Sequence, residues 1–326
     1  MPSFVTHYYF GQLAQKAVKL DDAVNEYPLS FNMGCQGPDL FFYYMDGAKH
    51  PDSSIPPASL GGFLHNHLIY EQFEYILDYV KKNGENGRAI AYAYGLLCHY
   101  AMDTVAHPFI YFMQEDVLPQ FYPEKKIPAL HILFETRLDN YVFNKKLNRS
   151  IKRFSNAVKT EKEDREAIAD FHLAVFKPMI DVDIDKKHIV KAAKFFKSYQ
   201  NVFDDPTKIL PTMLKGVSAI ASYPSKLYGF IHPKGLLSES EDWLNDTHRH
   251  WPRCRKEDEV VDWNFDEVLD RCVERIEYLA SDFNSARENN THLDKSLYNI
   301  TYDGNRTLCE SKAEAIASWN EELKNE

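Results

Sequence analysis

Apolar residues recur at helical spacing along most of the chain. The clearest stretches are residues 4–20 and 60–77, and the chain reads as helical again from residue 167 to its end. We find no alternating strand pattern, internal repeat or glycine-rich phosphate loop. These patterns predict an all-α, multi-helix bundle, most simply a single domain over residues 1–326.

One apolar segment, residues 95–112, carries polar groups at a regular interval. His99, Asp103 and His107 are four residues apart, so on a helix they lie one turn above another on the same face. Burying two imidazoles and a carboxylate is costly unless a partner compensates them, and a divalent metal would do so. Pro108 disfavours helical geometry at His107, which we therefore expect to project from the helix end. The alternative is a core helix with a hydrogen-bonded His and Asp.

A second pair at the same spacing follows the turn signals Pro119, Pro123 and Pro128. His131 and Glu135 again place a His and a carboxylate four apart among apolar residues. Two antiparallel helices joined by such a loop can face each other, each offering a His and an acid. Imidazole nitrogen and carboxylate oxygen suit zinc, and also iron or manganese. The sequence therefore predicts a metal site between these helices.

The candidate metal ligands nearer the N-terminus are marked by less specific patterns. Thr6 is a plausible helix N-cap, which would place His7 in the first turn. Asp39 follows a Gly-Pro turn, where an Asp most often caps a helix. His65 and His67 are two residues apart, so only one of them can readily point at a shared site from a helix.

Composition restricts the functional classes. With 44% apolar and 26% charged residues, the chain is typical of a globular protein, and its net charge of −10 argues against nucleic acid as the main partner. The aromatic run at residues 41–44 is expected in the core or on an apolar binding face. Five cysteines without C-x-x-C spacing are read as reduced thiols.

The N-terminal segment has no basic region followed by an apolar run, and no stretch reaches the length of a membrane span. We therefore expect no signal peptide, no transmembrane segment and a cytoplasmic location.

Taken together, these motifs resemble the zinc-dependent phospholipase C family, which includes bacterial phosphatidylcholine-hydrolysing enzymes and the clostridial alpha-toxin catalytic domain. The single-strand-specific zinc nucleases share its all-helical fold. The family pattern is an early His, an Asp after a Pro, a further His, then H-x-x-x-D, another His, and H-x-x-x-E. In this sequence the places are filled by His7, Asp39, His65 (or His67), His99, Asp103, His107, His131 and Glu135.

The resemblance covers roughly residues 1–140, the metal-ligand half, and leaves 141–326 as a helical C-terminal half. It implies three metal sites: Asp39, His65, His99 and Asp103; His107, His131 and Glu135; and His7 with a bridging Asp103. The secreted enzymes use their N-terminal amino group as a ligand, whereas this chain begins six residues before His7. We therefore expect two Zn²⁺ ions and leave a third open.

The function implied is metal-assisted hydrolysis of a phosphodiester in a phospholipid or a small molecule, with Asp39 orienting or deprotonating the attacking water. The absence of H-E-x-x-H disfavours a zinc protease. Two alternatives stay open. A zinc nuclease predicts a basic or aromatic groove beside the metals, and a non-enzymatic helical protein predicts a closed structural site. The substrate head group and the oligomeric state are left undetermined.

Overall fold

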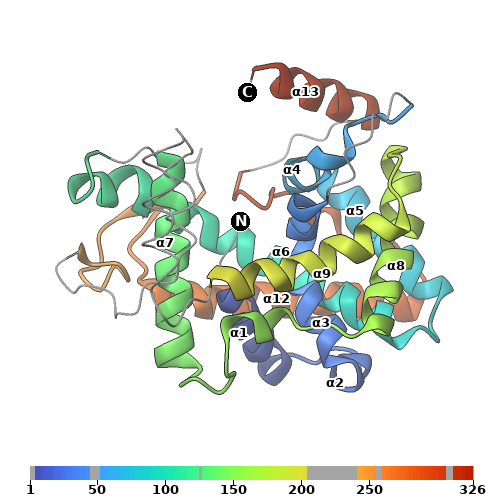
Figure 1. The fold of residues 1–326 in the computed structure, drawn as a ribbon, viewed down its shortest axis with the longest axis horizontal. Helices are drawn as coiled ribbons and strands as arrows, with labels where there is room; N and C mark the ends of the chain where they lie inside the picture. Colours follow the sequence, from blue (N-terminus) through green and yellow to red (C-terminus); the bar gives the residue numbers. More distant parts are fainter. Residues whose placement is uncertain are drawn as a thin grey trace.

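The computed structural model describes residues 4–44, 52–124, 127–203, 241–254, 259–305 and 311–325, and these are mainly helical (Figure 1). The α-helices are α1 (Phe4–Ala17), α2 (Ala23–Glu26), α3 (Pro28–Gly34), α4 (Leu60–Asn66), α5 (Ile69–Lys82), α6 (Gly87–Phe112), α7 (Ile127–Tyr141), α8 (Lys162–Ile180), α9 (Lys186–Phe203), α12 (Phe265–Asn289) and α13 (Lys312–Asn325). Short helical turns are η1 (Gly37–Tyr43), η2 (Pro57–Ser59), η3 (Met113–Val117), η4 (Leu118–Gln120), η5 (Val142–Lys146), η6 (Phe154–Val158) and η8 (Lys295–Tyr298). The predicted all-α class is confirmed.

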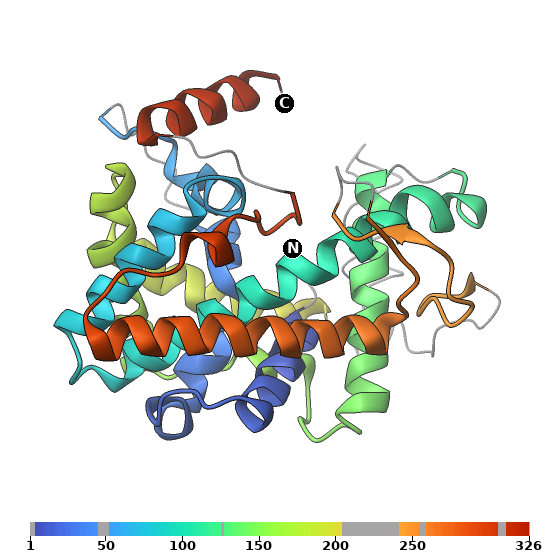
Figure 2. The ribbon, with the colours of Figure 1, turned by 180° about the vertical axis from the view of Figure 1, so that it is seen from behind.

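α6 lies at the centre of this arrangement. Nearly all of its side chains are buried, which matches its almost continuous apolar sequence, and α3 and α12 make the most extensive contacts with it. Figure 2 shows α12 running along one side of the molecule, whereas α9 crosses the opposite side in Figure 1. A helix apolar all round is expected in the interior, so α6 can carry polar groups only where they are compensated.

Glycines allow α3 and α6 to approach closely. A Cβ atom on Gly34 would lie 2.2 Å from the Tyr92 carbonyl oxygen, and one on Gly95 would lie 2.6 Å from the Gly34 Cα. Gly37 has a φ of +60°, and a Cβ there would lie 2.0 Å from the His99 ring. Larger residues would push η1, which carries Asp39, away from α6.

The continuous helix expected over residues 60–77 is wrong. It breaks between α4 and α5, where Leu68 has a φ of 54°. The Gln72 side chain stabilises the break, because its amide donates to the carbonyls of Leu64 and His67, both at 2.7 Å. Backbone carbonyls at the end of α4 therefore have a hydrogen-bond donor although the helix does not continue.

The expectation that Thr6 caps the first helix is also wrong. α1 begins at Phe4, and Asp139 of α7 serves as the acceptor at its start. The Asp139 carboxylate accepts from the backbone N–H of Val5 at 3.2 Å, from that of Thr6 at 2.8 Å and from the Thr6 hydroxyl at 2.7 Å. The helix also ends at Ala17 rather than continuing to residue 20.

The proline in α6 does not end the helix, so our expectation for His107 is wrong. α6 continues through Pro108 to Phe112. A proline removes one helical hydrogen bond, but the next turn buries Phe109, whose ring lies 5.8 Å from Phe134 and 5.5 Å from Trp251. We attribute the continued helix to this packing, and His107 therefore stays on the same face as Asp103.

The sequence showed no strand pattern, but a small antiparallel pair is present. β1 (Trp251–Pro252) pairs with β2 (Val260–Val261). This pair presents Trp251 to Phe109 near the end of α6. Within the described residues, no helix has the length and apolar character that crossing a membrane requires.

Replacing Asp139 with Ala would test the link between α7 and α1. We expect a loss of about 2 kcal/mol in the free energy of unfolding, because two buried backbone N–H groups would lose their acceptor. Urea denaturation measures this loss. The exposed control Asp270→Ala should stay within about 0.5 kcal/mol of the wild type. An equal effect of both variants would contradict the assigned role.

Candidate metal centre

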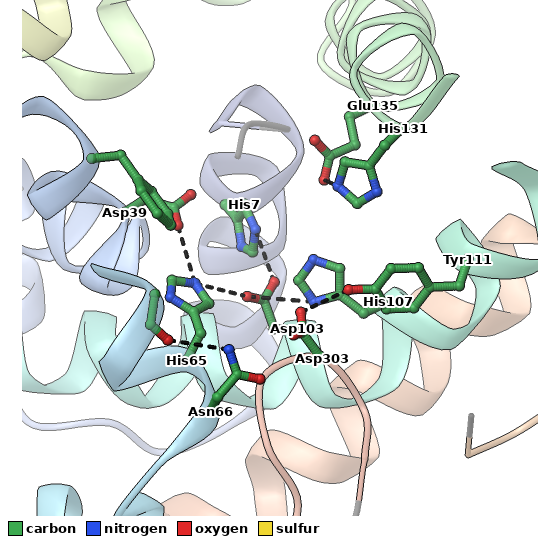
Figure 3. Close-up of a pocket in the computed structure, with 12 residues that line it drawn as sticks. His7, Asp39, His65, Asn66, Asp103, His107, Tyr111, His131, Glu135 and Asp303 are labelled. Carbon is green, nitrogen blue, oxygen red and sulfur yellow. Dashed lines mark hydrogen bonds and ion pairs between the residues drawn. The ribbon is translucent and has the colours of Figure 1, made fainter. Parts of the chain in front are cut away.

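Three groups of His and carboxylate side chains lie close together in space (Figure 3). Within each group, one possible ligand atom from every residue lies within 4.8 Å of the others. The groups are His7, His99 and Asp103; Asp39, His65 and His99; and His107, His131 and Glu135. All eight residues singled out from the sequence therefore belong to one region, where five helical elements meet.

Of the two alternatives, His65 in α4 faces this region, and His67, just past the end of α4, does not. His65 Nε2 lies 3.1 Å from Asp39 Oδ1. The His67 ring packs instead against Phe63, at 5.1 Å between centroids, and against Trp319 of α13, at 5.9 Å. Because α4 ends at Asn66, the two side chains point to different neighbours.

Four of the imidazoles are oriented by an oxygen that faces the Nδ1 atom of the ring. The Nδ1 atoms face the Gly61 carbonyl at 2.7 Å (His65), the Cys35 carbonyl at 3.1 Å (His99), the Tyr302 carbonyl at 2.6 Å (His107) and the Gln114 side-chain oxygen at 2.7 Å (His131). Since an oxygen can only accept here, each Nδ1 carries the proton and donates it. Each Nε2 then presents a lone pair, which is the usual arrangement of metal-binding histidines.

Asp103 lies at the centre and faces imidazoles from several elements. Its Oδ1 is 3.1 Å from His7 Nε2, and its Oδ2 is 3.0 Å from His99 Nε2. Asp103 Oδ2 is also 3.9 Å from His65 Nε2. The two oxygens thus face different groups, which is the placement that a bridging carboxylate requires.

Electrostatics keep these carboxylates ionised. Burial alone would raise the pKa of Asp103, but the imidazoles of His99, His107 and His7 hold it well below its usual range. Burial likewise opposes ionisation of Glu135, yet His131 lowers the pKa of Glu135 to about 2. Charged carboxylates are therefore present at neutral pH.

The histidines differ among themselves. Burial lowers the pKa of His99, and the nearby His7 lowers it further. The Asp103 carboxylate raises this pKa, but by less, so the pKa of His99 stays below its usual value. Burial also disfavours the charged form of His65, but the Asp39 carboxylate more than compensates and raises the pKa of His65.

The donor set fits zinc. Within the described residues, His7 Nδ1, His99 Nε2 and Glu135 Oε2 are buried without a hydrogen-bond partner. The neutral Nε2 atom of His99 directs its lone pair at Asp103 Oδ2, 3.0 Å away. Two hydrogen-bond acceptors at this distance repel each other unless a cation binds between them. Imidazole nitrogens and carboxylate oxygens are ligands that zinc prefers.

The three groups border one cavity of about 220 Å³. Its wall also includes Phe42, Asn66, Tyr111 and Asp303, and the Tyr111 hydroxyl donates to Asp303 at 2.8 Å. None of the residues that line the described cavity is an Arg or a Lys. Positive charge for a phosphate must therefore come from bound cations or from the imidazoles.

Comparison with protein families gives a match over residues 6–188, described as zinc dependent phospholipase C. This range covers more than half of the chain and includes all eight candidates. The chain belongs to the zinc-dependent phospholipase C family. The resemblance found from the motifs is thereby confirmed. Neither the curated proteins nor the solved structures gave a match.

The motifs did not reveal every residue of this zinc-dependent phospholipase C centre. Tyr302 and Asp303 come from the C-terminal half, which we expected to be only a helical support. No spacing in the sequence marks them, because they lie in a loop that reaches the site through folding. Asp139 could have been found, since it follows Glu135 by four residues on the same face of α7.

Metal content should distinguish His65 from His67. We expect His65→Ala, His99→Ala and Glu135→Ala each to lower the zinc content by about one ion per chain or more, because loss of one ligand greatly weakens a site with three or four. Elemental analysis of the purified protein measures it. His67→Ala is the matched control, because it is equally buried but lies outside the groups. Loss of zinc in His67→Ala with retention in His65→Ala would reverse the assignment.

Proposed function

We propose that this protein hydrolyses a phosphodiester bond of a phospholipid, using bound zinc and the Asp39 carboxylate. The observation that carries the proposal is the orientation of the imidazoles. Four Nδ1–H groups donate to oxygens, and the Nε2 atoms of His65, His99 and His131 face carboxylates at a single cavity. Family membership adds the reaction class, since this family consists of zinc-dependent phospholipases C.

The residues that would hold zinc form two main sites: Asp39, His65, His99 and Asp103; and His107, His131 and Glu135. His7 and Asp103 would contribute to a third. When bound, zinc supplies Lewis-acid polarisation of a phosphoryl oxygen and lowers the pKa of water, so that a nucleophile is available at neutral pH.

The chain itself positions the nucleophile and accepts its proton. Asp39 borders the cavity, and its Oδ1 is held 3.1 Å from His65 Nε2. Burial works against its ionisation, but nearby positive groups including His65 keep the pKa of Asp39 below its usual range. The carboxylate is therefore ionised and can orient a water molecule and take up a proton from it.

The part of the cavity wall next to His107 and His131 suits a cationic head group. Asp303 belongs to none of the three ligand groups, and the Tyr111 ring stands beside it at the cavity. Phe42 adds a second aromatic ring. A carboxylate with aromatic rings attracts a compact ammonium group, so we propose that this wall receives the amine end of a substrate such as phosphatidylcholine or phosphatidylethanolamine.

The other two interpretations have less support. A nuclease would need a basic groove for the backbone, whereas the described cavity wall has an added carboxylate and no basic chain other than histidine. A purely structural metal site would be closed, whereas these ligand groups border a space of about 220 Å³.

The reaction is tested with Asp39→Asn, which keeps the size of the side chain. We expect kcat for a chromogenic phosphodiester and for monomeric short-chain phosphatidylcholine to fall by about 10²-fold or more. The zinc content of each sample is measured in parallel, so that loss of the base is separated from loss of metal. Asp270→Asn on the exposed surface of α12 is the control. A zinc-loaded wild type that cleaves single-stranded DNA but neither phosphodiester would overturn the proposal.

Substrate preference is tested with Asp303→Asn. We expect kcat/KM for phosphocholine and phosphoethanolamine substrates to fall about 10-fold, the size expected for one lost charge interaction of moderate strength. A phosphoglycerol substrate, which lacks the ammonium group, should change little. Equal losses on all three substrates would show that Asp303 supports the site without selecting the head group.

A further inference from the structure

The helix α9 (Lys186–Phe203) is rich in positive charge. It contains five lysines and no acidic residue, although the whole protein carries a net charge of −10. This helix is therefore locally positive in a chain that is negative overall. Figure 1 shows this helix crossing the near side of the molecule, in front of the other helices that the structure describes.

The two faces of α9 are clearly separated. Ile189, Ala193 and Phe196 are buried, and the Phe196 ring packs against Tyr43 at 4.5 Å between centroids. The outer face carries Lys187, Lys191, Lys194 and Ser198, which follow one another at intervals of three and four residues and are all exposed. We call these four residues together with Phe195 the outer stripe of α9.

Phe195 is an exposed aromatic within this basic stripe. Its side chain is 42% exposed, and its ring lies 6.2 Å from Tyr43. Tyr43, Lys191, Lys194, Phe195 and Ser198 border an open recess of about 350 Å³. The apolar side of α9 already packs into the core, so Phe195 is not needed to dock this helix.

Two lysines of the stripe are available for a partner. Lys186 pairs with Asp170 at 2.6 Å, and Lys187 pairs with Asp185 at 2.9 Å. For Lys191 and Lys194, the described part of the chain offers no carboxylate within ion-pair distance. Two ammonium groups one turn apart thus flank an exposed phenylalanine.

The outer stripe contacts η1, which also carries a residue at the edge of the cavity. Tyr43, which contacts Phe195, follows Phe42 in η1. Phe42 borders the cavity, is 40% exposed, and has its ring 5.6 Å from that of His65. Two exposed aromatic rings, Phe195 on the outer stripe and Phe42 at the cavity, are thus joined through Tyr43, whose own side chain is buried.

We propose that the outer stripe of α9 docks this protein on the surface of a membrane that contains anionic phospholipid. Lys191 and Lys194 contact lipid phosphates, and Phe195 enters the head-group layer. Basic residues on one face of a helix together with an exposed aromatic are the features of helices that lie at a lipid surface. Docking at this position would bring the edge of the cavity near the lipids that it acts on, so the proposal extends the proposed function.

Binding to vesicles tests this without hydrolysis, so its result is independent of whether the proposed activity is found. The full-length protein is sedimented with phosphatidylcholine vesicles and with vesicles in which part of the lipid is phosphatidylglycerol. We expect clear binding only to the anionic vesicles and weaker binding as salt is raised. The double variant Lys191→Gln/Lys194→Gln should bind about 30-fold more weakly, at about 5-fold for each lysine.

The matched control is Lys16→Gln/Lys19→Gln, which removes the same charge from exposed positions near the end of α1 and should bind as the wild type does. Phe195→Ser, which removes the apolar anchor, should also weaken binding. Unfolding midpoints show that the variants remain folded. Equal binding to both vesicle types, no loss in the α9 variants, or an equal loss in the α1 control would overturn the proposal. Binding of duplex DNA through Lys191 and Lys194, without binding of vesicles, would overturn it as well.

Discussion

The carboxylate of Asp103 is buried in the middle of α6, and the arrangement around it follows from the cost of keeping a charge there. An isolated buried carboxylate costs several kcal/mol unless charges and hydrogen bonds compensate it. His99 from the same helix, His7 from α1 and His65 from α4 all face its oxygens. The elements that carry these histidines must therefore meet at one point of α6.

Close contact between backbones makes that meeting possible. Gly34 and Gly95 bring α3 against α6, and the carbonyl of Cys35, just past α3, then reaches His99 Nδ1 at 3.1 Å. Gly37 leaves room for the His99 ring under η1. The Gly61 and Tyr302 carbonyls hold two further imidazoles. Backbone oxygens therefore determine which nitrogen of these histidines carries the proton. A sequence motif lists only side chains, so it does not reveal these contacts.

The two halves of the chain contribute differently to the site. The family match ends at residue 188, and all eight candidate ligands lie before that point. The C-terminal half adds the Tyr302 carbonyl, the Asp303 carboxylate at the cavity wall, and Trp319, which packs against His67. The candidate ligands thus lie in the part that the family shares. The shape and charge of the cavity wall also depend on a part beyond the match.

The sequence by itself determined the helical class and the metal-ligand candidates. An apolar segment with His99, Asp103 and His107 at intervals of four can hide its polar groups only on one face of a helix, and the same holds for His131 and Glu135. The choice of His65 over His67 was decided by tertiary structure, because it depends on the break at Leu68 and on Trp319 from a distant helix. The continuation of α6 through Pro108 was also decided there, and we attribute it to the burial of Phe109. The position of Asp303 at the cavity also depends on tertiary structure. Local spacing records what a residue can do within its own helix, whereas these outcomes depend on contacts between residues that are far apart in the chain.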